Sequence, residues 1–122
     1  MAQKILFIDD EKDAVEFQKS YFSRRGYTVL SAGSTQEALE AIKNEALDLA
    51  FCDLKLESNT SGLDILKEAK GLKPNLPIYI ITGYLDKDVE DKALALGAKE
   101  VLHKPFPLPE LEQKIKATLS VF

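Results

Sequence analysis

The sequence has few of the residues that mark disulfide-rich, zinc-binding or membrane proteins. It has one cysteine, one histidine and no tryptophan in 122 residues. A single thiol, Cys52, excludes an internal disulfide and a cysteine-based zinc site, and we expect it to be a small core residue. The longest uninterrupted apolar runs are four residues, far short of the roughly 20 that cross a bilayer. We therefore expect a cytoplasmic protein with no membrane segment.

Positive charge is also scarce. The chain has 16 Lys and Arg against 20 Asp and Glu, a formal net charge of -4, which argues against generic binding to nucleic acid or anionic lipid. Hydrophobic residues make up 45% and charged residues 30%, an ordinary globular composition that excludes disorder. The length predicts one domain over residues 1–122 with a core that needs no covalent staple.

Short apolar runs alternate with longer amphipathic stretches along the whole chain. The runs predict strands at residues 4–8, 27–30, 47–52, 78–81 and 100–103. The stretches between them predict helices that begin near residues 10, 34, 61, 86 and 109. The runs lack alternating polarity, which is typical of strands covered on both faces. We therefore predict an α/β fold, a single (βα)5 doubly wound parallel sheet with strand order 2-1-3-4-5.

Local signals place the ends and inner faces of these helices. Ala14, Phe17 and Tyr21 are spaced to face the core from the helix over residues 10–25. Ser34 and Glu37 form a capping box, residues 61–64 form a second one, and Asp86 is a candidate N-cap.

Polar side chains follow four of the five predicted strands. They are Asp9, Asp10 and Glu11 after the first strand, Asp53 after the third, Thr82 after the fourth and Lys104 after the fifth. These four strands are neighbours in the predicted order, and ligands in such sheets bind beyond the carboxyl ends of the strands. We therefore expect the side chains to meet in one crevice.

Carboxylates that meet in this way require a cation or a proton. Two like charges ~4 Å apart repel by about 4 kcal/mol at an effective dielectric constant of 20. Mg²⁺ is the expected partner because it takes carboxylate and phosphate oxygens as ligands. One screened carboxylate could then attack phosphorus to form an aspartyl phosphate, with Thr82 and Lys104 contacting the phosphoryl oxygens.

From Lys4 to Leu119 the chain resembles the receiver (response-regulator) domains of two-component signalling, which have a flavodoxin-like fold. The matching segments are ILFIDDE at 5–11, FCDLKL at 51–56, GLDIL at 62–66, IITG at 80–83 and KPF at 104–106. The resemblance implies that Asp53 accepts a phosphoryl group from the phosphohistidine of a histidine kinase or phosphotransfer protein. It also implies that Thr82 is the switch hydroxyl and that Lys104 contacts the phosphate.

The same resemblance implies a Mg²⁺ site, with Mn²⁺ as a substitute. Asp10, Asp53 and the backbone carbonyl of Lys55 would be direct ligands, and Asp9 would act through water. The Lys104–Pro105 peptide bond is often cis in this family.

The sequence departs from the family pattern at three places. Val101 stands where the family has an aromatic switch residue on the fifth strand, which puts the usual coupling of that residue to Thr82 in question. The loop from Asp53 to Gly62 is one residue longer than is typical and lacks the usual proline. Tyr84, two residues beyond Thr82, lies where the family varies.

The predicted function is therefore a phosphorylatable switch that is not an enzyme. The resemblance places the output surface on helix 4, strand 5 and helix 5, roughly residues 84–116, for a downstream protein partner. We expect a monomer or weak dimer, and no direct contact with nucleic acid or membrane.

Three alternative functions are weighed against this one. A haloacid-dehalogenase-like phosphatase would also form an aspartyl phosphate, but it needs a second acid where this chain has Lys55. A phosphorylation-independent binding module is favoured by Val101 and opposed by the complete set of site residues. Nucleotide binding is the weakest reading, because the acidic loop after the first strand has no G-x-G spacing.

Overall fold

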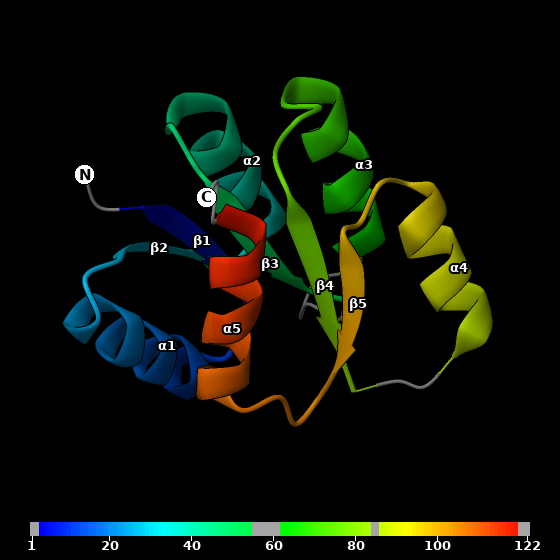
Figure 1. Cartoon of the computed structure of the whole chain (residues 1–122). Coiled ribbons are helices and arrows are strands. Elements are labelled where there is room, and N and C mark those ends of the chain that lie inside the picture. The colour runs from blue at the N-terminus through cyan, green and yellow to red at the C-terminus, as the bar shows by residue number, and fades with distance from the viewer. Residues whose placement is uncertain (1–2, 55–61, 84–85, 120–122) are drawn as a thin grey trace.

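The computed structural model describes residues 3–54, 62–83 and 86–119. Strands and helices alternate throughout (Figure 1). The strands are β1 (Lys4–Ile8), β2 (Thr28–Ala32), β3 (Leu49–Asp53), β4 (Ile78–Thr82) and β5 (Glu100–His103). The helices are α1 (Lys12–Arg24), α2 (Thr35–Asn44), α3 (Gly62–Leu72), α4 (Lys87–Ala95) and α5 (Leu108–Leu119). The predicted succession of elements is confirmed.

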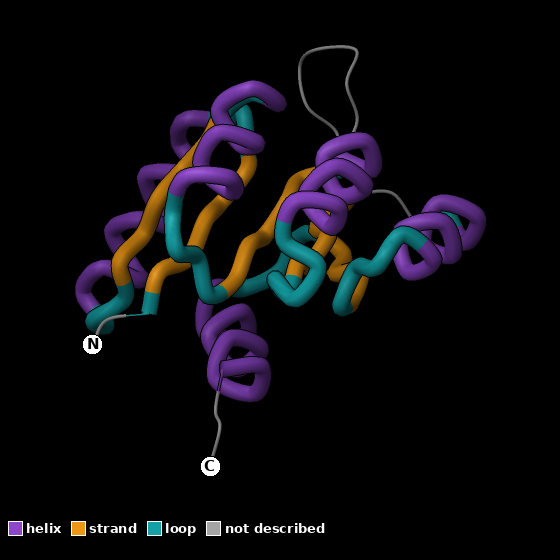
Figure 2. The backbone as a smooth tube through the Cα atoms, turned by 90° about the horizontal axis from the view of Figure 1, so that it is seen from above, coloured by secondary structure: helices purple, strands orange, loops and turns teal. Residues whose placement is uncertain are grey.

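All strand pairs are parallel, and the sheet order is β2-β1-β3-β4-β5. Helices cover both faces of this sheet (Figure 2). The predicted doubly wound topology is therefore confirmed. The register pairs Asp53 with Ile81 and Thr82 with His103, so the polar ends of the central strands lie at the same edge.

Each face of the sheet has its own hydrophobic core because successive side chains point to opposite faces. Residues such as Leu6, Ala50 and Ile80 pack under α2, α3 and α4, and Cys52 lies in this core as expected. On the other face, the rings of Phe7, Phe51 and Tyr79 stack across three neighbouring strands, with centroids 5.2 and 5.3 Å apart, under α1 and α5.

The predicted inner face of α1 is wrong at one position. Phe17 is 73% exposed, whereas Phe22 is fully buried. The helix begins at Lys12 rather than residue 10, and its inner positions include Gln18, one turn after Ala14. A half-buried glutamine, whose Oε1 atom is buried, therefore occupies an inner position of the helix, whereas the predicted aromatic ring does not.

Most helix ends lie where local sequence signals place them. The Ser34 hydroxyl accepts a hydrogen bond from the Glu37 N–H at 3.2 Å, and Asp86 caps α4 by accepting from the Asp88 N–H at 2.9 Å. The predicted cap at Ser61 lies outside the described residues. None of the described helices has the length and apolar content that a membrane crossing requires.

Strands β1 and β5 have the predicted ends, whereas the ends of β2, β3 and β4 differ from the predicted ones by one or two residues. Strand β2 runs Thr28–Ala32 and β3 runs Leu49–Asp53. Asp53 therefore belongs to the last position of its strand instead of the loop after it. This placement fixes the Asp53 backbone in the sheet.

Candidate functional site

Three carboxylates meet at the carboxyl edge of the sheet. Asp9 and Asp10 follow β1, and Asp53 ends the adjacent strand β3. One carboxylate oxygen from each of the three lies within 4.8 Å of the others. The structure thus brings together the three acids that the strand pattern predicted to converge.

Sheet-like hydrogen bonds continue past the strand ends and hold the loops that carry the site. The Asp9 N–H donates to the Ala32 carbonyl at 3.0 Å, and the Lys104 N–H donates to the Thr82 carbonyl at 2.8 Å. Beyond β3, the Leu54 N–H donates to the carbonyl of Ile81 at 3.0 Å. The site residues are therefore attached to a rigid sheet, which suits a site that must hold charges in fixed positions.

Asp9 is the most deeply placed of these acids, with 7% of its surface exposed. Burial raises the pKa of its carboxyl group. The hydrogen bond from the Glu11 N–H at 2.9 Å and the charge of Lys104 oppose that rise, while the charges of Asp53 and Asp10 add to it. In the absence of a metal ion, the folded protein therefore disfavours the charged form of the Asp9 carboxyl group.

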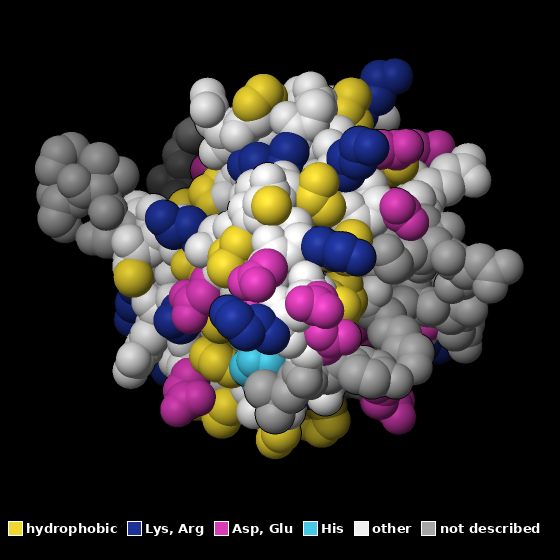
Figure 3. All heavy atoms as spheres, turned by 90° about the vertical axis from the view of Figure 1, so that its right-hand side faces the viewer, with side chains coloured by type: hydrophobic (Ala, Val, Ile, Leu, Met, Phe, Trp, Pro, Cys, Tyr) yellow, Lys and Arg dark blue, Asp and Glu magenta, His cyan; other side chains and the backbone are white. Residues whose placement is uncertain are grey.

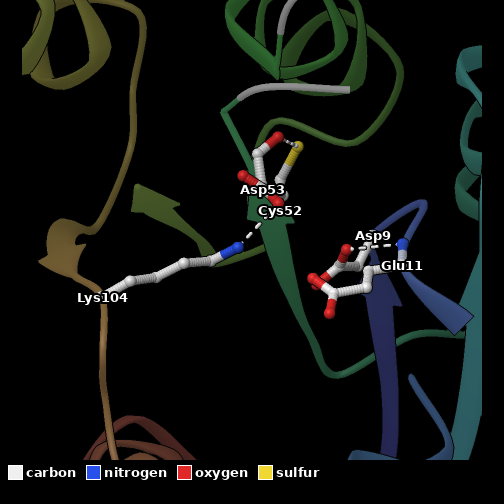
Figure 4. Close-up of polar contacts among 5 residues, drawn as sticks. All are labelled: Asp9, Glu11, Cys52, Asp53 and Lys104. Carbon is white, nitrogen blue, oxygen red and sulfur yellow. Dashed lines mark hydrogen bonds and ion pairs between the residues drawn. The ribbon is translucent and has the colours of Figure 1, made fainter. Parts of the chain in front are cut away.

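Lys104 supplies the positive charge of the site. Its side chain extends from the end of β5 towards Asp53 (Figure 4), and its Nζ lies 2.8 Å from Asp53 Oδ2. Burial lowers the pKa of the ammonium group, but the hydrogen bond to Asp53 and the nearby carboxylates outweigh it and raise the pKa overall. Lys104 therefore stays protonated beside Asp53.

Thr82 ends β4 and is 2% exposed. It directly follows Ile81, the residue that pairs with Asp53 across the sheet. The hydroxyl group is thus carried by the strand next to Asp53, at the edge where the acids meet. The predicted role of Thr82 as the switch hydroxyl stays a prediction.

The sequence analysis missed the steric role of Gly62. A Cβ atom at this position would lie 2.5 Å from the Asp53 carbonyl oxygen and 2.9 Å from Leu54 Cα, closer than real Cβ atoms approach. The Gly62 N–H also donates to the Leu54 carbonyl at 2.7 Å. Only glycine lets α3 start this close to the backbone of Asp53, and a glycine nine residues after the acid was the available signal.

Three further predictions concern the surroundings of the site. Lys55 and Tyr84 lie outside the described residues, so the expected carbonyl ligand stays a prediction. Val101 is partly buried and packs against the core under α2, α3 and α4. The Lys104–Pro105 peptide bond is cis, as the family resemblance implied.

The donor set fits a hard divalent cation. Mg²⁺ and Mn²⁺ prefer carboxylate and other oxygen ligands, and Mg²⁺ usually takes only one or two carboxylates, with water and phosphate oxygens completing its shell. The group of three aspartates supplies such ligands. Burial is the main cause of the raised pKa of Asp9, and the negative charges of Asp53 and Asp10 add to it.

Comparison with known proteins supports the family resemblance that the sequence suggested, and it does so over almost the whole chain. The sequence model of the response regulator receiver domain matches residues 5–116. The crystal structure of a response regulator receiver domain protein (CheY-like) from Methanospirillum hungatei JF-1 superposes with a TM-score of 0.93 at 31% identity, covering 98% of this chain and 95% of that one.

Two curated relatives differ in how much of their length is matched. Regulatory protein VanR from Enterococcus faecium is 38% identical over 98% of this chain, but the match spans only 51% of VanR. Sporulation initiation phosphotransferase F from Bacillus subtilis is 30% identical over 98% of this chain and 95% of its own length. The chain therefore spans about half of one relative and nearly all of the other.

Proposed function

Because the chain belongs to the response regulator receiver domain family, we propose that Asp53 is its phosphoacceptor and that a phosphohistidine of a histidine kinase or phosphotransfer protein is the donor. The observation that carries this proposal is the grouping of Asp53 with Asp9, Asp10 and Lys104 at one edge of the sheet. The chain is a phosphoacceptor signalling module.

In the proposed transfer, a carboxylate oxygen of Asp53 attacks the phosphorus atom. A P–O bond forms as the P–N bond of the phosphohistidine breaks, and the electron pair of that bond returns to the imidazole nitrogen. Lys104 lies 2.8 Å from Asp53 and would contact a phosphoryl oxygen as a point charge. The Thr82 hydroxyl would donate to another phosphoryl oxygen.

Mg²⁺, held directly by Asp10, Asp53 and the backbone carbonyl of Lys55 and through water by Asp9, would offset the negative charge of the carboxylates and of the incoming phosphoryl group. The role of Asp9 is to complete the acidic cluster from its buried position. Mn²⁺ has the same preference for oxygen ligands.

We also propose that the output surface comprises α4, β5 and α5. Figure 3 shows the side of the molecule on which α4 lies, where acidic and basic side chains mix with scattered hydrophobic ones. Leu94 is 44% exposed on α4, Lys87 and Asp91 form an ion pair along this helix, and Glu90 Oε2 of the helix lies 3.9 Å from His103 Nε2 of β5. Thr82 pairs with His103 across the sheet, which links the site directly to this surface.

A direct test is phosphorylation by a small donor. The metal-free protein is mixed with acetyl phosphate and Mg²⁺, and its intact mass is measured over time. We expect the mass of one phosphoryl group to be added to the wild-type protein and none to Asp53→Asn. Lys104→Ala should slow the gain on the order of 100-fold, because one charged contact to the transferring group is lost.

Asp13→Asn is the matched control, because Asp13 is an exposed aspartate on α1 outside the acidic cluster. A normal mass gain in Asp53→Asn would show that the acceptor lies elsewhere. No gain in the wild-type protein would favour a phosphorylation-independent binding module. Steady turnover of phosphomonoesters would instead favour a phosphatase.

A further inference from the structure

A pocket of about 410 Å³ lies beside the acidic cluster on the α1 and α5 face of the sheet. Its size is within the range of pockets that bind small molecules. The lining residues come from β1, β3, β4, α1, α5 and the segment after β5. The pocket therefore continues from the phosphoacceptor into the layer between the two helices.

The interior of the pocket is apolar. Phe7, Phe51 and Ile81 form its floor on the sheet, and Leu108 and Leu111 line it from α5. The three floor residues are almost fully buried in the hydrophobic core of this face. An apolar group that enters the pocket would displace water from a rigid hydrophobic surface.

The space exists because α1 presents short or polar side chains there. Ala14 and Gln18, one helical turn apart, both line the pocket, and the large apolar side chain between them, Phe17, points to solvent. Gln18 Oε1 is buried and has no hydrogen-bond partner among the described residues. An unpaired buried acceptor is costly, so a donor group on a bound molecule would stabilise this position.

Negative charge surrounds the mouth of the pocket. Among the residues that the structure describes, Asp9, Glu11 and Asp53 line it together with one cation, Lys104. The side chains of Asp9 and Glu11 lie together on one side of the β3 end, and Lys104 approaches from the other side (Figure 4). The mouth therefore has an excess of carboxylate groups on the side that is away from Lys104.

We infer that this pocket binds a small organic cation, namely an amine whose apolar body carries a hydrogen-bond donor. The ammonium group sits by the carboxylates of Asp9 and Glu11. The body fills the space over Phe7 and Phe51, and its donor group pairs with Gln18 Oε1. Charge complementarity at the mouth selects a cation over a neutral or anionic molecule of the same shape.

Binding of the amine opposes binding of a metal ion. Asp9 and Asp53 belong both to the pocket mouth and to the acidic cluster. Two cations that share carboxylates each weaken the binding of the other, and by the same factor. This coupling rests on the metal site of the proposed function, whereas binding of the amine itself does not.

The probe is tyramine, which has an ammonium group, an aromatic body and a phenol O–H. Its binding to the full chain is measured by calorimetry with a chelator present and no phosphodonor. Two analogues separate the contacts, since tyrosol lacks the positive charge and 2-phenylethylamine lacks the phenol O–H. We expect one tyramine per chain and at least about five-fold weaker binding of each analogue.

Three variants on or before α1 locate the site. Ala14→Leu fills the pocket and should weaken tyramine binding by at least about ten-fold, whereas Ser20→Leu on the exposed face should not. Glu11→Gln should weaken binding about three-fold, with Glu16→Gln as its exposed control. Gln18→Leu should remove the preference for tyramine over 2-phenylethylamine. Circular dichroism verifies that each variant is folded.

Saturating Mg²⁺ should weaken tyramine binding by about ten-fold, which is within the usual range of coupling between sites. The inference is overturned if tyramine does not bind, if tyrosol binds as well as tyramine, or if a folded Ala14→Leu protein keeps full affinity. Because these measurements involve no phosphodonor, their failure leaves the assignment of Asp53 untouched. Loss of phosphorylation in the earlier test would likewise not alter them.

Discussion

At the scale of single residues, Asp9 shows a conflict between folding and cation binding. Its carboxyl group is buried and lies within reach of two other aspartates. One backbone hydrogen bond from Glu11 and the charge of Lys104 only partly compensate, so its pKa is raised. The group that we propose helps to hold a cation therefore destabilises the metal-free protein.

Replacing Asp9 with asparagine should stabilise the metal-free protein by about 1 kcal/mol, the usual gain from removing an unfavourable charge. Asparagine keeps an oxygen that can accept from the Glu11 N–H, but it carries no charge. Urea unfolding in the presence of a chelator measures the difference. Asp13→Asn, at an exposed position, serves as the control and should show no such gain.

The pH dependence of the same experiment has a defined sign. The folded wild-type protein holds the Asp9 proton to higher pH than the unfolded chain does, because the pKa is raised in the fold. This contribution to stability is therefore present at acid pH and is lost as pH rises through the folded pKa. Asp9→Asn should lack that loss, and a variant less stable than wild type at neutral pH would contradict the interpretation.

At the scale of elements, the structure confirms the helix caps predicted at Ser34 and Asp86 and contradicts the predicted inner position of Phe17 on α1. The caps at Ser34 and Asp86 depend on side chains that bond to the next turn of the same helix, so the sequence alone shows them. The exposed side of α1 depends on what the sheet and α5 place against it. Phe17 therefore lies at an exposed position instead of the predicted inner one, because the pattern of apolar residues fits more than one helix rotation.

This difference predicts unequal costs for two phenylalanines on α1. Phe17→Gln should change the free energy of unfolding by less than about 0.5 kcal/mol, because the ring is 73% exposed. Phe22→Ala should cost roughly 3–5 kcal/mol, because this ring is fully buried and contacts Phe7 at a centroid distance of 5.5 Å. Equal costs in urea unfolding would contradict the observed orientation of the helix.

The candidate site was predictable to the extent that it follows from sheet geometry. Parallel strands carry Asp9, Asp53, Thr82 and Lys104 to one edge whatever the details of the packing. The role of Gly62 depends on a close approach between two backbones, for which the sequence offers only a glycine nine residues after the acid as a signal. The pocket beside the site exists because the side chains between α1 and α5 do not fill the space there. A sequence pattern gives the size of each side chain but does not show where the packed elements leave a gap.

At the scale of the whole molecule, contacts distant in sequence connect the helices of one face to each other and to the sheet. Arg25, just after α1, donates to Glu112 of α5 at 2.6 Å across 87 positions of the chain, and the Tyr79 and Thr118 hydroxyls share a hydrogen bond between β4 and α5. The Glu112 side chain is 10% exposed. Asp53, the proposed phosphoacceptor, and the mouth of the pocket adjoin this layer, so we expect binding at the site to affect the stability of the whole fold.

Mg²⁺ should therefore stabilise the entire protein against unfolding. A ligand at a hundred times its Kd adds ~2.7 kcal/mol when it binds only the folded state, and the acidic cluster exists only in the fold. Urea unfolding at increasing Mg²⁺ measures this gain, which should be smaller in Asp10→Asn and unchanged in the exposed control Asp13→Asn. Without the metal, Asp9→Asn should be more stable than wild type, because it lacks the unfavourable buried charge. With Mg²⁺, it should gain less stability than wild type, because it also lacks a carboxylate that is proposed to bind the cation. Equal gains in wild type and Asp10→Asn would place the cation elsewhere.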